Sequence, residues 1–114
     1  MAVQERPRRR QLIYYMTVYD DEDGRLLGRL VDITVGGVKL LSREAVELDR
    51  DYVLRLEPPE GGPNPEPLRF NGRSRWADRD VNPDYTVTGF ELEPLDPALQ
   101  RRIEGLIEAY GFSR

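Results

Sequence analysis

The fold class is decided by the stretch Gln11-Leu12-Ile13-Tyr14-Tyr15-Met16-Thr17-Val18-Tyr19. β-Branched and aromatic residues dominate it, and alternate positions form one face, made by Leu12, Tyr14, Met16 and Val18. This period of two predicts a β-strand. The acidic run that follows ends in Asp23-Gly24, a dipeptide typical of a hairpin turn in which glycine supplies a positive φ. The chain is therefore expected to begin its folded part with a β-hairpin.

Further strand-like segments follow this hairpin along most of the chain. They are expected at about residues 25–33, 38–41, 52–57, 68–76 and 85–92. Residues 42–48 are ambiguous and are compatible with a short helical turn, whereas the proline- and glycine-rich segment 58–65 is the clearest loop. Six short strands without interleaved helices predict an all-β sandwich or closed barrel.

The C-terminal segment changes to a helical period. Asp96 is a good N-cap, and Pro97 suits the first helical position. Apolar residues then recur at helical spacing, and Gly111 is placed to end a helix over residues 96–110. Such an apolar stripe more often plugs the end of a barrel than binds a partner, so we expect a plug.

Composition narrows the possible functions. The chain has 114 residues, no cysteine and no histidine, which removes disulfides, thiolate metal sites and the commonest general base. We therefore expect a single domain with no catalytic residues, no metal and no cofactor. The net charge of −4 argues against general affinity for nucleic acid polymers. No apolar run is long enough for a membrane span and no h-region follows the basic N-terminus, so a cytoplasmic location without membrane insertion is expected.

The strongest candidate site is the run Asp32-Ile33-Thr34-Val35-Gly36-Gly37. It places a carboxylate, a hydroxyl and a glycine backbone at the end of the second predicted strand. A carboxylate can accept hydrogen bonds from guanine N1–H and N2–H₂, and the Thr34 hydroxyl can donate to a phosphate or a base. Gly37 is expected to allow close backbone approach or a positive φ. The structural alternatives are that Asp32 caps a turn amide, that Thr34 is an ordinary strand residue and that the glycines only make a turn.

A second candidate is the basic run Arg6-Pro7-Arg8-Arg9-Arg10. Arg6 and Arg10 lie four residues apart on residues 1–10, which we expect to form a flexible arm before a folded domain at 11–114. A guanidinium can bind phosphate or guanine O6 and N7 with two hydrogen bonds and can stack on a purine. The alternative for such a run, taken by itself, is a solvated basic tail.

Together the two runs resemble the signature of the PilZ family, bacterial domains that bind cyclic di-GMP. That signature is Arg-x-x-x-Arg followed by Asp/Asn-x-Ser-x-x-Gly; here Arg6 and Arg10 match the first part, and Asp32, Thr34 and Gly37 match the second. Thr34 stands where the family usually has serine. The resemblance implies a six-stranded antiparallel barrel finished by a C-terminal helix, and it implies these five residues as the ligand site.

Two further residues are secondary ligand candidates, Arg9 and Trp76. Trp76 falls late in a strand where some PilZ-like domains touch ligand. Strand parity, however, groups Trp76 with Leu68 and Phe70, which predicts a core position.

The sequence thus favours a non-catalytic bacterial receptor that binds cyclic di-GMP and relays the signal to an unidentified effector protein. One alternative is a PilZ-like adaptor that binds partners without nucleotide. Another is a small barrel for single-stranded nucleic acid with Tyr14, Tyr15 and Tyr19 as stacking platforms.

Overall fold

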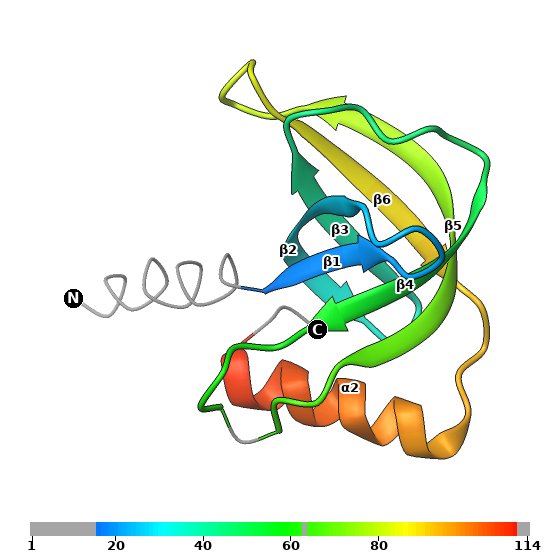
Figure 1. Ribbon diagram of the computed structural model, residues 1–114, viewed down its shortest axis with the longest axis vertical. Coiled ribbons are helices and arrows are strands. Elements are labelled where there is room, and N and C mark those ends of the chain that lie inside the picture. Colours follow the sequence, from blue (N-terminus) through cyan, green and yellow to red (C-terminus); the bar gives the residue numbers. More distant parts are fainter. Residues whose placement is uncertain (1–15, 63, 112–114) are drawn as a thin grey trace.

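The computed structural model describes residues 16–62 and 64–111. Within them six strands form a closed antiparallel barrel with the neighbour order β1-β2-β3-β6-β5-β4. The strands are β1 (Thr17–Asp20), β2 (Leu26–Thr34), β3 (Gly37–Ser42), β4 (Asp51–Glu57), β5 (Leu68–Arg79) and β6 (Thr86–Leu92). The helix α2 (Pro97–Tyr110) follows the last strand and lies across one end of the barrel (Figure 1).

The expected strands and helix are confirmed in number and order within the described residues. β5 runs three residues further than predicted, to Arg79, and residues 43–50 contain bends but neither a helical turn nor a strand. Residues 11–15 of the first predicted strand, and the whole arginine arm, lie outside the described residues. Gly24 adopts the expected positive φ, at 79°.

The barrel interior is filled by the alternate side chains of every strand. Met16, Val18, Leu30, Leu40, Leu54 and Leu56 are completely buried. The edge of the Tyr52 ring packs against the Phe90 ring, with centroids 5.7 Å apart and planes at 88°. This edge-to-face arrangement is favourable for aromatic pairs. The period-two pattern therefore assigned the inward face correctly along most of the sheet.

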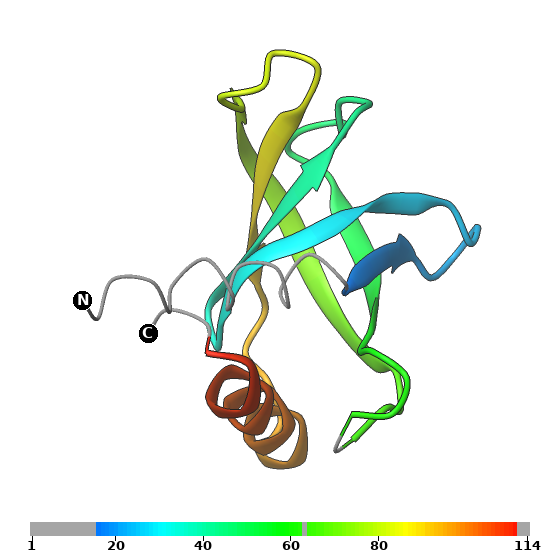
Figure 2. The same ribbon diagram turned by 90° about the vertical axis from the view of Figure 1, so that its left-hand side faces the viewer.

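The helix closes the barrel as the sequence predicts. Asp96 Oδ1 accepts a hydrogen bond from the backbone N–H of Leu99 at 2.8 Å, and Gly111 ends the helix with φ of 74°. Ile103, Leu106 and Ile107 are buried in the same cluster as the strand residues. Figure 2 shows the helix below the barrel, near the turn between β2 and β3. Within the described residues no helix is long and apolar enough to cross a membrane.

Candidate functional site

A small open hollow of about 170 Å³ lies beside the turn between β2 and β3. We call it the strand-end hollow; its lining includes Asp32, Thr34, Gly37, Lys39, Trp76 and Gly89. β2 and β3 supply the first four of these residues, and β5 and β6 supply the other two. Three residues that the sequence analysis chose as one motif thus border a single concavity, and Trp76 joins them there.

Asp32 is half-buried near the end of β2, opposite Lys39 of β3. Its Oδ1 accepts a hydrogen bond from the backbone N–H of the next residue, Ile33, at 3.0 Å. This contact fixes the carboxylate but uses only one of its two oxygens. The structural alternative, in which Asp32 accepts from a nearby backbone amide, is therefore observed. The second carboxylate oxygen remains able to accept a hydrogen bond from a ligand.

Thr34 also makes a local contact. Its Oγ1 accepts from the backbone N–H of Gly36 at 3.2 Å, which braces the turn between β2 and β3. Since the hydroxyl acts as the acceptor there, its proton is available to another group. A serine would make the same contact, so threonine keeps the chemistry that the turn requires.

Gly37 is required by the closure of the barrel. A Cβ at this position would lie 2.9 Å from the carbonyl oxygen of Phe90 on β6. The group that comes close to Gly37 is thus the neighbouring strand, and the approach of a ligand to this glycine stays a prediction. The φ of Gly37 is not positive, so the second part of that expectation does not apply.

The predicted core position of Trp76 is wrong. The β5–β6 register shifts between Ser74 and Trp76, so that Ser74 faces Phe90 and Trp76 faces the adjacent residue, Gly89. Such a bulge inserts one residue and reverses which side chains face inward. Ser74 is completely buried, whereas Trp76 is 41% exposed on the outer face. The structure therefore places Trp76 at the hollow.

Two further residues, Lys39 and Gly89, line the strand-end hollow beside Trp76 and were not predicted from the sequence. A Cβ on Gly89 would overlap the Trp76 ring, so the indole lies directly over the Gly89 backbone. The Nζ of Lys39 lies 5.9 Å from the centroid of the same ring, within cation–π range. Strand alternation could have identified Lys39, because it lies between the buried residues Val38 and Leu40. Gly89 could be recognised only after the bulge was known.

The three arginine candidates, Arg6, Arg9 and Arg10, lie outside the described residues. The structure does fix where the chain enters the barrel. The backbone N–H of Leu30 donates to the carbonyl of Met16 at 2.9 Å, and Thr17 pairs with Arg29. Because β1 and β2 are antiparallel, Met16 lies at the end of β1 from which β2 continues toward Asp32 and Thr34.

The outer face of the barrel shows fewer free cations than the sequence suggested. Arg69, Arg73 and Arg75, the basic face of β5, each form an ion pair, at 3.1, 3.1 and 2.8 Å. Tyr19, one of the suggested stacking platforms, has the Arg55 guanidinium 4.8 Å from its ring centroid. Tyr14 and Tyr15 lie outside the described residues. These contacts disfavour the single-stranded nucleic acid interpretation.

Fold and site together define a small six-stranded β-barrel domain, closed by a helix and carrying a polar, tryptophan-lined hollow at the β2–β3 turn. The family model of the PilZ domain matches residues 4–109, and the chain belongs to this family. PilZ domains are generally receptors without catalytic activity. No curated protein matches the chain.

A solved structure with the same fold gives a structural comparison. The chain is similar to the inhibitor of motility MotI/DgrA of Bacillus subtilis, with a TM-score of 0.58 and 13% sequence identity. The match covers 80% of this chain and 43% of that one, so the chain corresponds to less than half of the matched protein.

Proposed function

We propose that the protein is a non-catalytic receptor for cyclic di-GMP that passes the signal to a partner protein. The observation that carries the proposal is the convergence of Asp32, Thr34 and Trp76 on one hollow. Family membership supports the same ligand class. A receptor for a bacterial second messenger acts in the cytoplasm, which is the location that we propose.

The residues of the strand-end hollow match the chemistry of the nucleotide. The carboxylate of Asp32 presents acceptors for the two parallel donors of a guanine edge. The exposed indole of Trp76 offers a surface on which a purine can stack. Lys39, opposite Asp32, adds a cation that can approach a phosphate.

The arginine arm supplies the remaining contacts in this proposal. From Met16 back to Arg10 six residues span up to about 20 Å. From Leu30, the partner of Met16, forward to Thr34 four residues of strand cover about 13 Å. Arg10 is thus within reach of the hollow, and Arg6 has the reach to fold over a ligand bound there. Contacts of guanidinium groups with two phosphates can supply the ~8 kcal/mol that a micromolar Kd requires.

Calorimetric titration with cyclic di-GMP tests the proposal, with GTP as the control ligand. We expect selective binding that Arg10→Ala and Asp32→Asn each weaken at least tenfold, while Arg101→Ala on α2 leaves it unchanged. Trp76 is the chain's one tryptophan, so its fluorescence should change with the same midpoint.

A folded wild-type protein that shows neither heat nor a fluorescence change would contradict the receptor function. The adaptor without nucleotide would then be the better interpretation. A large loss of thermal stability in Arg10→Ala would identify Arg10 as a structural residue and remove it from the proposed site.

A further inference from the structure

A groove of about 390 Å³ lies between the turn that joins β2 to β3 and the C-terminal half of α2. We call it the turn–helix groove; its lining is made by Thr34, Val35, Glu104, Ile107 and Glu108. Figure 2 shows the C-terminal end of α2 beneath this turn. Thr34 also lines the strand-end hollow, so the two concavities meet at the turn.

The turn–helix groove is acidic. Glu104 and Glu108 are both exposed, and because they lie four residues apart on α2 their side chains share one face of the helix. Among the residues that the structure describes, neither carboxylate forms an ion pair and no cation lines the groove. Glu104 Oε2 accepts a hydrogen bond from the side-chain amide of Gln100 at 3.3 Å. Like charges at this spacing repel, so a cation bound between them would be favourable.

The groove also has an apolar surface. Val35, in the turn, is 40% exposed, and it shares the lining with Ile107 of α2. An inorganic cation would leave this surface in water. An arginine side chain combines the two properties that the groove requires, because its apolar stem covers hydrophobic surface while its guanidinium group reaches a carboxylate. The groove therefore fits an arginine-rich segment of polypeptide.

The chain carries such a segment just before the barrel, in the basic run at residues 6–10. The carbonyl of Met16 pairs with the amide of Leu30, and from there β2 covers about 13 Å to Thr34. The six residues from Met16 back to Arg10 span up to about 20 Å, so the run reaches the groove. A segment tethered at this distance has a local concentration on the order of millimolar. The tether favours the chain's own arm over any free basic peptide.

We propose that, in the absence of nucleotide, the arginine arm docks in the turn–helix groove of its own barrel. Its guanidinium groups pair with Glu104 and Glu108, and their stems cover Val35. The guanidinium groups of Arg6 and Arg10 are also the proposed contacts of cyclic di-GMP, and they cannot pair with the groove and with phosphates at once. Docking therefore competes with nucleotide binding and lowers its apparent affinity. This competition rests on the proposed function, whereas the docking itself does not.

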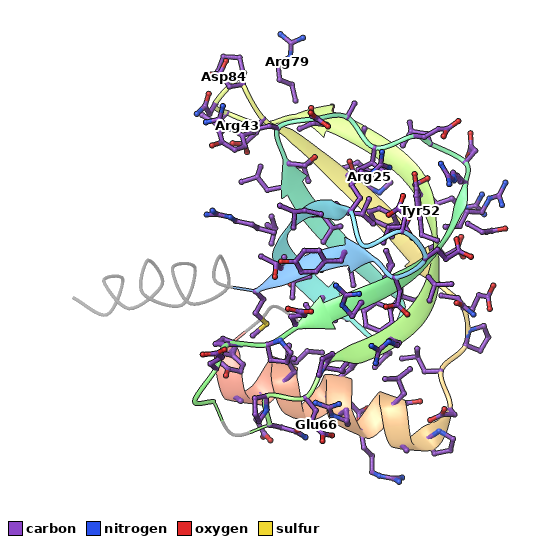
Figure 3. The ribbon with its side chains drawn as sticks, viewed as in Figure 1. Arg25, Arg43, Tyr52, Glu66, Arg79 and Asp84 are labelled. Carbon is purple, nitrogen blue, oxygen red and sulfur yellow. The ribbon has the colours of Figure 1, made fainter. Side chains whose placement is uncertain are left out.

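The first test uses the full chain without nucleotide and a nitroxide spin label on the arm. The chain has no cysteine, so Gln4→Cys accepts a single label close to the basic run. We expect the label to broaden the amide NMR signals of Val35 and Glu108 strongly and that of Glu44 little. Figure 3 shows Arg43, the sequence neighbour of Glu44, at the opposite end of the barrel from α2.

Two double variants separate docking in the groove from general charge attraction. Glu104→Gln/Glu108→Gln removes both carboxylates and should abolish most of the broadening at Val35. Glu22→Gln/Glu44→Gln makes the same change in net charge at exposed positions outside the groove, and it should retain the broadening.

Calorimetric titration with cyclic di-GMP tests the competition. Glu104→Gln/Glu108→Gln should bind the nucleotide about three- to tenfold more tightly than wild type, because its arm is free, while Glu22→Gln/Glu44→Gln should match wild type. Equal affinity of the groove variant and wild type would overturn the competition. If no variant binds nucleotide but the expected broadening is observed, the receptor function fails and the docking stands.

Three results would overturn the docking itself. They are the absence of broadening at Val35 and Glu108 in the labelled wild type, unchanged broadening in Glu104→Gln/Glu108→Gln, and an equal loss in both double variants. A mixture of spin-labelled chain with isotope-labelled chain that carries no nitroxide identifies the source of the arm. Broadening at the groove of the isotope-labelled copy would overturn docking within one chain, since the arm of a second copy would then be the occupant.

Discussion

Single glycines decide how closely the strands approach around the site. Gly36 and Gly37 are adjacent in the motif, but they meet different surroundings. A Cβ on Gly36 would have its nearest neighbour at 4.0 Å, the Thr34 hydroxyl oxygen, whereas a Cβ on Gly37 would crowd a backbone carbonyl at 2.9 Å. The second glycine of the pair is therefore the one on which the barrel depends.

We expect Gly37→Ala to lower the free energy of unfolding by about 1–3 kcal/mol, because a rigid carbonyl on β6 must move to admit the methyl group. Gly36→Ala is the matched control and should change it by less than about 0.5 kcal/mol. Urea unfolding of the two variants measures both. Equal stability of the two would show that β6 moves away at little cost.

At the scale of elements, a bulge in β5 places Trp76 at the strand-end hollow. The extra residue in β5 brings Trp76 outward beside β6, whereas Ser74, which precedes the bulge, keeps the inward side of Leu68 and Phe70. Ser74 Oγ then donates to the Glu47 carbonyl at 2.7 Å and accepts from the Arg50 amide at 3.2 Å. These contacts satisfy a buried hydroxyl and hold the irregular segment before β4 against β5.

The N-cap of α2 gives a prediction for the helix. Asp96→Ala removes the acceptor of the Leu99 amide and should lower the free energy of unfolding by about 1 kcal/mol. Asp96→Asn keeps a side-chain oxygen at the same place and should restore most of the loss. Thermal unfolding followed by circular dichroism compares the variants, and an asparagine variant as weak as alanine would contradict a capping role.

An ion-pair cluster joins the first turn to β4 and β5. Asp21 bonds to Arg55 at 3.0 Å and to Arg69 at 3.1 Å. The Arg55 hydrogen bond, with the charge and hydrogen bond of Arg69, lowers the pKa of Asp21 against the smaller opposing effect of desolvation. The folded-state pKa of Asp21 is lower than its unfolded-state pKa of about 4. This cluster therefore stabilises the fold fully above the unfolded pKa, and the contribution is lost as pH falls through the folded pKa.

We therefore expect Asp21→Asn to flatten the fall in stability at acid pH. Urea unfolding of wild type and variant at pH 7, 5, 4 and 3 measures this fall. Glu22→Gln, an exposed neighbour in the same turn, should retain the wild-type slope. A slope in Asp21→Asn equal to that of the wild type would show that the cluster does not stabilise the fold.

At the scale of the whole molecule, the helix and the strand-end hollow lie at the same end of one closed barrel. α2 packs beside β2 and closes the end of the barrel that is near the strand-end hollow. Figure 3 shows Arg25 and Arg43 well away from the helix.

Weakening the contact between α2 and the barrel tests how far the stability of the barrel depends on its helix. Ile103 is completely buried, and Ile103→Ala should lower the free energy of unfolding by about 2–5 kcal/mol through lost contacts and the cavity left behind. Glu108→Ala on the exposed side of α2 should stay within about 0.5 kcal/mol of wild type. A small effect of Ile103→Ala would mean that the barrel closes without the helix.

The sequence by itself determined where the strands lie along the chain, where the helix begins and ends, and which residues form the strand-end motif. Local patterns suffice for these features, because alternation, turn dipeptides and capping residues act between neighbours in the chain. The PilZ resemblance rested on the same short motifs, and the family match confirms it.

Only the tertiary structure decided the exposure of Trp76 and the place of Lys39 and Gly89 beside it. A bulge depends on the register of two strands, and register is set by pairing between distant segments. Contacts of this kind are made across the sheet, where sequence period carries no information about distance.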